Sequence, residues 1–381
     1  MRRLAQNLIL SLFSILVCAA LVEAFFRVLD RAPEEPSPEA TGPTAEHYRF
    51  NGYHPLLGYD GLPSARGRFH GRTVTHNSLG NRGPEAAFAK PAGVRRVVVM
   101  GDSQAWGYGV GDDETIPAQL ARLLEQGGGA RWEVLNLGVG GYGTDQAFLK
   151  YLVQGARYSP DVVVLTVFKN DPVENAHTVY WGVEKPRFYV EDGRLCLGNV
   201  PPARAPGWPN NRLLADREPS LRIPGTQLDL ARSATARFFM RREWLPSLLA
   251  RDDSGLAAVR EQVGCIRNRK AYDGDGMEIL ERLVTELARI TARQGARLVL
   301  VFVPRSKDVE DPSLPAYYDG AAAAFRAQGI PFVDLRQRLA APAAGGVSSF
   351  LPNDPHLSAA GSGIAAAALR DCLLKAQGPC D

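Results

Sequence analysis

The sequence has few cysteines, and none of them is arranged for metal binding. Its five cysteines form no Cys-x-x-Cys pair, and none has a histidine neighbour at the spacing of zinc ligands. We therefore expect no metal site. No charge of one sign dominates either, because 44 basic and 41 acidic residues leave a net charge of +3. That balance predicts no nucleic-acid partner.

The sequence also shows no internal repeat. Its 381 residues suffice for one large domain with appendages. Cys18 lies in an apolar N-terminal run, and the other four cysteines allow two disulfides in an oxidising compartment. We favour Cys196 with Cys265 and Cys372 with Cys380, while spacing alone leaves other pairings open.

One long apolar run stands at the N-terminus. Arg2 and Arg3 precede the uncharged stretch Leu8–Val22, a pattern typical of an export signal. We expect residues 1–31 to act as an uncleaved signal anchor. The positive-inside rule then predicts a single-pass protein of the cell membrane with an extracytoplasmic (periplasmic) domain. The alternative is cleavage after Ala24, which gives a secreted chain.

Composition divides the rest of the chain into three parts. Residues 32–45 are rich in proline and predict an extended linker. Residues 46–95 are aromatic and glycine-rich, and we expect a lead-in segment of loops and short strands packed on the core. The main domain covers residues 96–381, with an insertion at about 174–270 where the periodicity is weak. We expect this insertion to lie over the carboxyl edge of the sheet as a cap, because it leaves the domain just after the third strand, beside that edge.

Strands and helices alternate within the main domain. The apolar runs that predict strands are Arg96–Met100, Trp132–Leu137, Asp161–Phe168, Arg297–Val303 and Pro331–Leu335. The segments that predict helices are Ile116–Leu124, Gln146–Tyr151, Met277–Gln294, Tyr317–Gln328 and Ala359–Leu374. This alternation predicts an α/β fold, a three-layer α/β/α sandwich with a mainly parallel five-stranded sheet.

Two polar or glycine-rich motifs follow the first two predicted strands. Gly101-Asp102-Ser103 places a serine at a strand-to-helix turn, where its hydroxyl and backbone N–H can reach a ligand. A simple helix cap is an equal alternative for Ser103. Residues 136–144 contain four glycines, which let a backbone approach a ligand closely. An ordinary tight turn is the alternative, and the missing Gly-Lys-Ser/Thr ending argues against a phosphate loop.

Two further polar motifs follow later strands. Asn170 comes after the third strand, where its amide can donate to an oxyanion or initiate a turn before Pro172. Asp354 and His356 precede the C-terminal helix. A carboxylate beside an imidazole fixes its tautomer, whereas the plainer alternative is a solvated loop capped by Ser358.

The order of these motifs at successive strand ends resembles the SGNH hydrolases, also called GDSL esterases, and in particular their membrane-anchored bacterial members. The resemblance implies a flavodoxin-like sheet and a nucleophile at Ser103. It implies an oxyanion hole formed by the N–H groups of Ser103 and Gly141 and the amide of Asn170. His356 becomes the general base and Asp354 its partner.

The chain departs from this family pattern in three places. Gln104 follows the serine where leucine is usual, and no glycine precedes Asn170. Asp354 stands two residues before the histidine, while Asn353 holds the usual position of the aspartate. Residues 77–83, Asn-Ser-Leu-Gly-Asn-Arg-Gly, are similar to a lead-in segment of membrane-associated members.

The resemblance implies a serine ester hydrolase that works through an acyl-serine and requires no metal or organic cofactor. We expect the substrate to be an O-acetyl or short acyl ester on a carbohydrate or envelope glycan. Two alternatives stay open: an O-acyltransferase of envelope polysaccharide, and a non-catalytic binding or assembly protein. Trp106, Tyr108 and Tyr142 would suit stacking on a sugar, although aromatic residues more often serve packing.

Overall fold

The chain divides into two compact units. One comprises Met1–Ala40 and Arg212–Asp253, and the other comprises Thr41–Asn211 and Ser254–Asp381. The first unit and the predicted linker lie almost wholly outside the described residues. Within the part of the chain that is described, no helix has the length and apolar character needed to cross a membrane. The computed structural model describes Gln6, Ser14, residues 17–22, 49–180, 183–202, 254–267, 275–311, 316–340 and 348–375, and Cys380.

Five strands form the central sheet of the second unit, and each runs parallel to its neighbours. Valine and leucine dominate these strands, which suits burial on both faces. The order across the sheet is β14-β13-β7-β5-β6, the arrangement of flavodoxin-like folds, and the predicted fold class is confirmed. The strands are β5 (Val94–Met100), β6 (Arg131–Asn136), β7 (Val162–Val167), β13 (Arg297–Phe302) and β14 (Phe332–Asp334).

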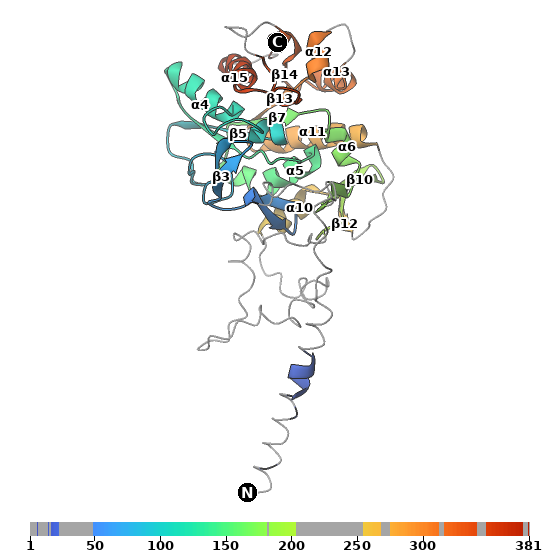
Figure 1. Ribbon diagram of the computed structural model, residues 1–381. Coiled ribbons are helices and arrows are strands. Elements are labelled where there is room, and N and C mark those ends of the chain that lie inside the picture. Colours follow the sequence, from blue (N-terminus) through green and yellow to red (C-terminus); the bar gives the residue numbers. More distant parts are fainter. Residues whose placement is uncertain are drawn as a thin grey trace. The chain divides into compact units, whose positions relative to one another are not determined.

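Helices cover both faces of this sheet (Figure 1). Successive side chains of β5 point to opposite faces. Val97 and Val99 pack with α4 and α15, whereas Val98 and Met100 pack with α5, α11 and α13. Two apolar cores therefore separate three layers, as predicted. The helices are α4 (Ile116–Gln126), α5 (Thr144–Val153), α11 (Gly276–Arg293), α13 (Asp319–Ala327) and α15 (Ala359–Leu374).

The lead-in segment folds as two antiparallel hairpins, in line with the short strands expected there. Short helices join the larger elements. The hairpin strands are β1 (Asn51–His54), β2 (Gly58–Gly61), β3 (Arg66–Phe69) and β4 (Arg72–Thr75). The short helices are α3 (Ser103–Trp106), η1 (Gly155–Tyr158), α6 (Asp171–Asn175), α12 (Ser306–Glu310) and α14 (Arg336–Ala340).

The described part of the insertion carries a small sheet of its own, in the order β10-β11-β12. Phe188, Leu197 and Val259 belong to the same apolar core as α5 and α11, so this part packs on a helical layer of the main domain. Its elements are β8 (Val179–Tyr180), β9 (Val183–Glu184), β10 (Arg187–Glu191), β11 (Arg194–Gly198), α10 (Ser254–Gln262) and β12 (Cys265–Arg267).

Both favoured disulfide pairings are confirmed. Cys196 and Cys265 lie opposite each other on β11 and β12 and are bonded. Cys372 in α15 is bonded to Cys380, and Cys18 is a free, exposed thiol. The first disulfide joins two strands of the insertion sheet, β11 and β12, through cysteines that are 69 residues apart in the chain.

His76 is buried where the lead-in segment meets α3. Trp106 Nε1–H donates to His76 Nε2 at 3.2 Å, and His76 Nδ1 lies 3.3 Å from the carbonyl of Leu62. A neutral ring protonated on Nδ1 satisfies both contacts. Phe50 packs against the same ring, with the two ring centroids 5.6 Å apart. Burial lowers the pKa of His76 to about 3.

Mild acid should therefore destabilise the protein through His76. The unfolded imidazole takes up a proton below its usual pKa of about 6.5, while the folded one stays neutral down to about pH 3. The free energy of unfolding should fall by about 1.6 kcal/mol between pH 6.5 and pH 5 from this residue. Urea titrations at the two pH values should show a smaller loss of unfolding free energy in His76→Gln than in the parent protein. Glutamine keeps a hydrogen-bond donor and an acceptor but does not titrate. An equal loss in both proteins would contradict this assignment.

Candidate active site

The turn after β5 places Ser103 at the carboxyl edge of the sheet. Gly101 has a φ of +141°, and a Cβ there would lie 2.1 Å from Thr166 Oγ1 on the neighbouring strand β7. Only glycine fits this close approach. Asp102 then caps α3 by accepting the N–H of Gln104 at 2.9 Å, which leaves Ser103 as the first residue of the helix. The edge lies where the strand order reverses, the usual ligand position in such sheets.

Ser103, His356 and Asp354 form a continuous hydrogen-bonded chain. His356 Nε2 lies 2.7 Å from Ser103 Oγ, and His356 Nδ1 lies 2.6 Å from Asp354 Oδ1. An ionised carboxylate only accepts, so Nδ1 carries the proton and Nε2 is free to accept from the serine hydroxyl. The hydrogen bond from His356 lowers the pKa of Asp354 and keeps its carboxylate charged. The structure thus brings together the three predicted catalytic residues.

The short spacing between Asp354 and His356 has a local explanation. Asp354 Oδ1 accepts the backbone N–H of His356 at 2.8 Å as well as its ring N–H. One oxygen therefore closes a tight turn and orients the imidazole. Asn353, at the family's usual aspartate position, is exposed and adopts a left-handed φ of 56°. The carboxylate two residues before the histidine is the one that contacts it.

Gln104 acts at the site although the sequence analysis noted it only as a departure from the family pattern. Its Nε2 donates to the carbonyl of Pro355 at 3.3 Å, and its Oε1 accepts the N–H of Leu357 at 3.2 Å. These two groups flank His356 in the backbone. A buried amide beside the nucleophile therefore holds the loop that carries the base. The sequence offered no signal for this pairing, since the partners are about 250 residues apart.

The predicted oxyanion donors have unused N–H groups. Within the described ranges, the backbone N–H groups of Ser103 and Gly141 donate to no backbone carbonyl. Gly141 has a φ of +77°, a conformation that glycine adopts without strain. Asn170 is the N-cap residue before α6, but its side chain makes no cap hydrogen bond there. Its Nδ2 donates one N–H to Glu174 Oε1 at 2.5 Å, and the second N–H is available to a ligand.

Buried carboxyl groups surround this part of the site. Asp171 accepts the N–H of Phe168 at 2.6 Å and the hydroxyl of Thr144 at 2.9 Å, which ties the end of β7 to the glycine-rich loop. Burial raises the pKa of Asp171 and Glu174 well above the usual range, and raises that of Asp102 to about 6. Such clustering of perturbed acids is typical of functional sites.

Of the three aromatic residues considered for sugar stacking, Trp106 and Tyr142 are buried and serve packing. The Tyr142 hydroxyl donates to the carbonyl of Tyr59 at 2.5 Å. Tyr108 is half-buried, and its ring stacks on His356 with centroids 4.1 Å apart. Only Tyr108 therefore belongs to the immediate site.

One group in the described part of the chain has the side-chain clustering of a metal site: Glu191, Cys196 and Cys265. Its two cysteines are joined in a disulfide, so neither offers a thiolate ligand. This group also lies on the small insertion sheet, apart from the residues described above. It gives no reason to place a metal at the Ser103 site.

Several solved structures resemble this chain at low sequence identity. Solved structures with a similar chain path include a lipolytic protein of the G-D-S-L family from Desulfitobacterium hafniense, at 10% identity and a TM-score of 0.38, covering 72% of this chain and 97% of that one. TesA has 11% sequence identity and a TM-score of 0.38, and the match covers 72% of this chain and 94% of TesA. A GDSL-like lipase from Bacteroides thetaiotaomicron has 13% sequence identity and a TM-score of 0.35, and the match covers 74% of this chain and 89% of the lipase.

No curated protein matches the chain. The sequence pattern of the GDSL-like lipase/acylhydrolase family, by contrast, matches residues 99–364, well over half of the chain. The matched range includes every residue of the hydrogen-bonded chain from Ser103 to Asp354. The protein therefore belongs to the GDSL-like lipase/acylhydrolase family of ester-hydrolysing enzymes.

Proposed function

We propose that the protein cleaves an O-acetyl or short acyl ester with Ser103 as nucleophile, His356 as general base and Asp354 as its orienting partner. The observation that carries this proposal is the unbroken hydrogen-bonded chain from Ser103 Oγ through the imidazole to Asp354 Oδ1. A serine hydroxyl is a weak nucleophile at neutral pH, and an adjacent base that accepts its proton activates it. The intact pair argues against a purely binding role.

The chemistry follows from the positions of these groups. His356 Nε2 takes the proton of Ser103 as the oxygen attacks the ester carbonyl, and Asp354 stabilises the resulting imidazolium. The N–H groups of Ser103 and Gly141 and the amide of Asn170 are the proposed donors to the tetrahedral oxyanion. The imidazolium then protonates the leaving alcohol. Water, activated by the same imidazole, releases the acyl group from the serine.

We propose an acylated carbohydrate, such as an envelope glycan, as the acyl donor. The support for this substrate class is the predicted extracytoplasmic position of the domain. Transfer of the acyl group to a second sugar, as an O-acyltransferase would perform, would use the same acyl-serine. The ratio of free acid to acylated sugar, measured with an acylated sugar donor and excess acceptor, separates hydrolysis from transfer.

Replacing the nucleophile tests the proposal most directly. Ser103→Ala should lower the hydrolysis rate of p-nitrophenyl acetate by about 10³-fold or more, because only oxyanion stabilisation and binding remain. It should also abolish labelling by a fluorophosphonate. Ser78→Ala is the control, since Ser78 is exposed in the lead-in segment and its change should leave the rate unaltered. Near-normal turnover by Ser103→Ala would refute the nucleophile assignment.

A second pair of variants distinguishes the two candidate partners of His356. Asp354→Ala should reduce turnover by about 10²- to 10⁴-fold, since the imidazole loses the group that fixes its tautomer and stabilises its charge. Asn353→Gly should keep a turnover close to that of the parent enzyme, because glycine adopts the left-handed φ of this exposed position without strain. Steady-state turnover of the two purified variants provides the comparison. The reverse order of activities would make Asn353 the functional residue.

We also propose that the enzyme is anchored in the cell membrane, with its domain outside the cytoplasm. The support is the uncharged run Leu8–Val22 after Arg2 and Arg3, together with two disulfides, which form in oxidising compartments. Membrane fractions should retain the full-length chain until detergent is added, and protease outside intact spheroplasts should digest the domain. Complete protection would refute this topology, and release of a chain starting near Phe25 would replace the anchor by a cleaved signal.

A further inference from the structure

One face of the His356 imidazole is covered by an aromatic ring. Tyr108 stacks on it with ring centroids 4.1 Å apart and planes inclined by 19°. Asp354 and Ser103 contact only the edge of the imidazole, through its two nitrogens. The stacked phenol ring therefore restrains rotation of the imidazole out of its plane more closely than Phe168, whose ring centroid lies 6.4 Å from that of His356.

Tyr108 also contacts the lead-in hairpin formed by β3 and β4. Phe69 meets its ring edge-on with centroids 5.2 Å apart. The Tyr108 hydroxyl lies 2.9 Å from His70 Nε2, within hydrogen-bond distance. Both partners come from the segment that precedes the sheet, outside the range matched by the family pattern. The lead-in segment thus reaches the catalytic histidine through one intermediate side chain.

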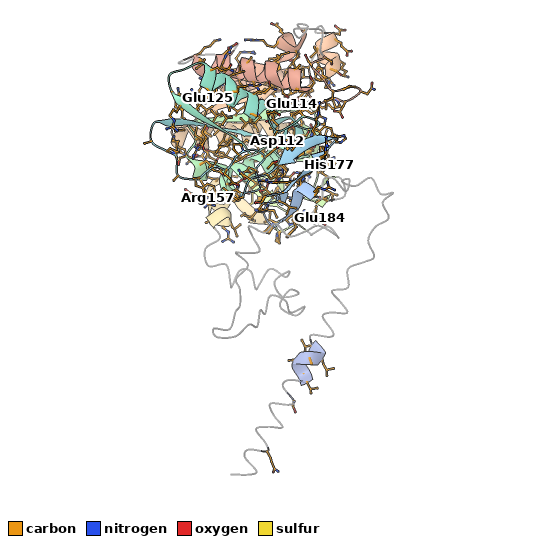
Figure 2. The ribbon with its side chains drawn as sticks, turned by 60° about the vertical axis from the view of Figure 1, so that its left-hand side comes forward. Asp112, Glu114, Glu125, Arg157, His177 and Glu184 are labelled. Atoms are coloured by element: carbon orange, nitrogen blue, oxygen red, sulfur yellow. A yellow bond between two sulfur atoms is a disulfide. The ribbon has the colours of Figure 1, made fainter. Side chains whose placement is uncertain are left out.

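Arg82 holds the backbone on both sides of Tyr108. Its Nη1 donates to the carbonyl of Gly107 at 2.6 Å, and its Nη2 donates to that of Val110 at 2.7 Å. Its Nε donates to Asp112 at 2.9 Å, and Asp112 lies in the same loop between α3 and α4 (Figure 2). The guanidinium side chain is only 1% exposed. A lysine could not reproduce this set of bonds, because its single ammonium lacks the planar fork.

The loop is also anchored to the nucleophile. The N–H groups of Gly107 and Tyr108 donate to the carbonyl of Ser103 at 2.9 and 3.0 Å. Tyr108 is therefore placed relative to Ser103 by the backbone and relative to His356 by its ring. Arg82 holds the remainder of the loop between α3 and α4. The distance between the nucleophile and the base therefore depends on the side chains of both Arg82 and Tyr108.

We propose that Tyr108 is a positioning residue for the general base His356, and that the lead-in segment holds it in place through Arg82, Phe69 and His70. The inference rests on the proposed function, in which His356 takes the proton of Ser103. The electron-rich face of the phenol ring also favours the positive charge that the imidazole gains in that step. Three side chains of the lead-in segment, Phe69, His70 and Arg82, then support the active site from outside it.

The test compares two replacements of Tyr108 in the full-length chain. Tyr108→Leu removes the aromatic face and should lower kcat for p-nitrophenyl acetate by about 10- to 100-fold, with KM changed less than about threefold. Tyr108→Phe keeps the face and removes the hydroxyl that contacts His70, so it should recover most of kcat. The rate of fluorophosphonate labelling, which needs the same base, should follow the same order.

Two further variants separate positioning from stability. Arg82→Lys should lower kcat in the direction of Tyr108→Leu while the chain remains folded by circular dichroism. Phe88→Leu removes a different aromatic contact of the lead-in segment, with Tyr158 at 4.7 Å, and should lower the melting temperature without changing kcat. A merely structural role for Tyr108 predicts that Tyr108→Leu behaves like Phe88→Leu.

The outcomes distinguish this inference from the proposed function. If Ser103→Ala is inactive but Tyr108→Leu keeps the parent kcat, the inference is wrong and the function stands. If Tyr108→Phe loses as much as Tyr108→Leu, the hydroxyl and not the ring face is responsible, and the inference is again wrong. Full activity of Ser103→Ala refutes the proposed function and the inference with it.

Discussion

The hydrogen bond between Ser103 Oγ and His356 Nε2 joins residues 253 positions apart in the chain. Each end of it depends on a different part of the fold. Gly101 allows β5 to approach β7 closely enough for the serine to reach the sheet edge. Asp354 and Gln104 fix the loop that brings the histidine to it from the other end of the chain. An error of about 1 Å at either end would separate nucleophile and base, with a large cost in rate.

Buried polar groups around this bond make the site rigid. Asp102 caps the helix of the nucleophile, Asp171 joins the end of β7 to the glycine-rich loop, and Glu174 holds the amide of Asn170. Isolated carboxylates would destabilise a protein interior, so each of these groups is bonded to an N–H or hydroxyl donor. Their raised pKa values show the cost of burial. A network of this kind specifies one arrangement of the site more sharply than apolar packing does.

The lead-in segment contributes a second layer to the site. His76 accepts from Trp106 in the helix of the nucleophile, and Arg82 bonds the carbonyls of the loop that follows it. The family match begins at residue 99, so His76 and Arg82 both precede the part of the chain that carries the family pattern. The structure nonetheless joins them to the nucleophile turn directly.

Periodicity predicted the five strands of the central sheet, its longer helices and its parallel arrangement, because these signals are local in the sequence. The residues of the hydrogen-bonded chain were predicted from the resemblance of the motif order to a known family. Even the pairing of Cys196 with Cys265 agreed with expectation. Only the tertiary structure showed that Gln104 clamps the loop of His356, that Tyr108 covers its ring, and that the insertion packs its apolar side chains on α5 and α11. Those contacts join segments far apart in the chain, and their partners are decided by how the layers pack, which no local pattern encodes.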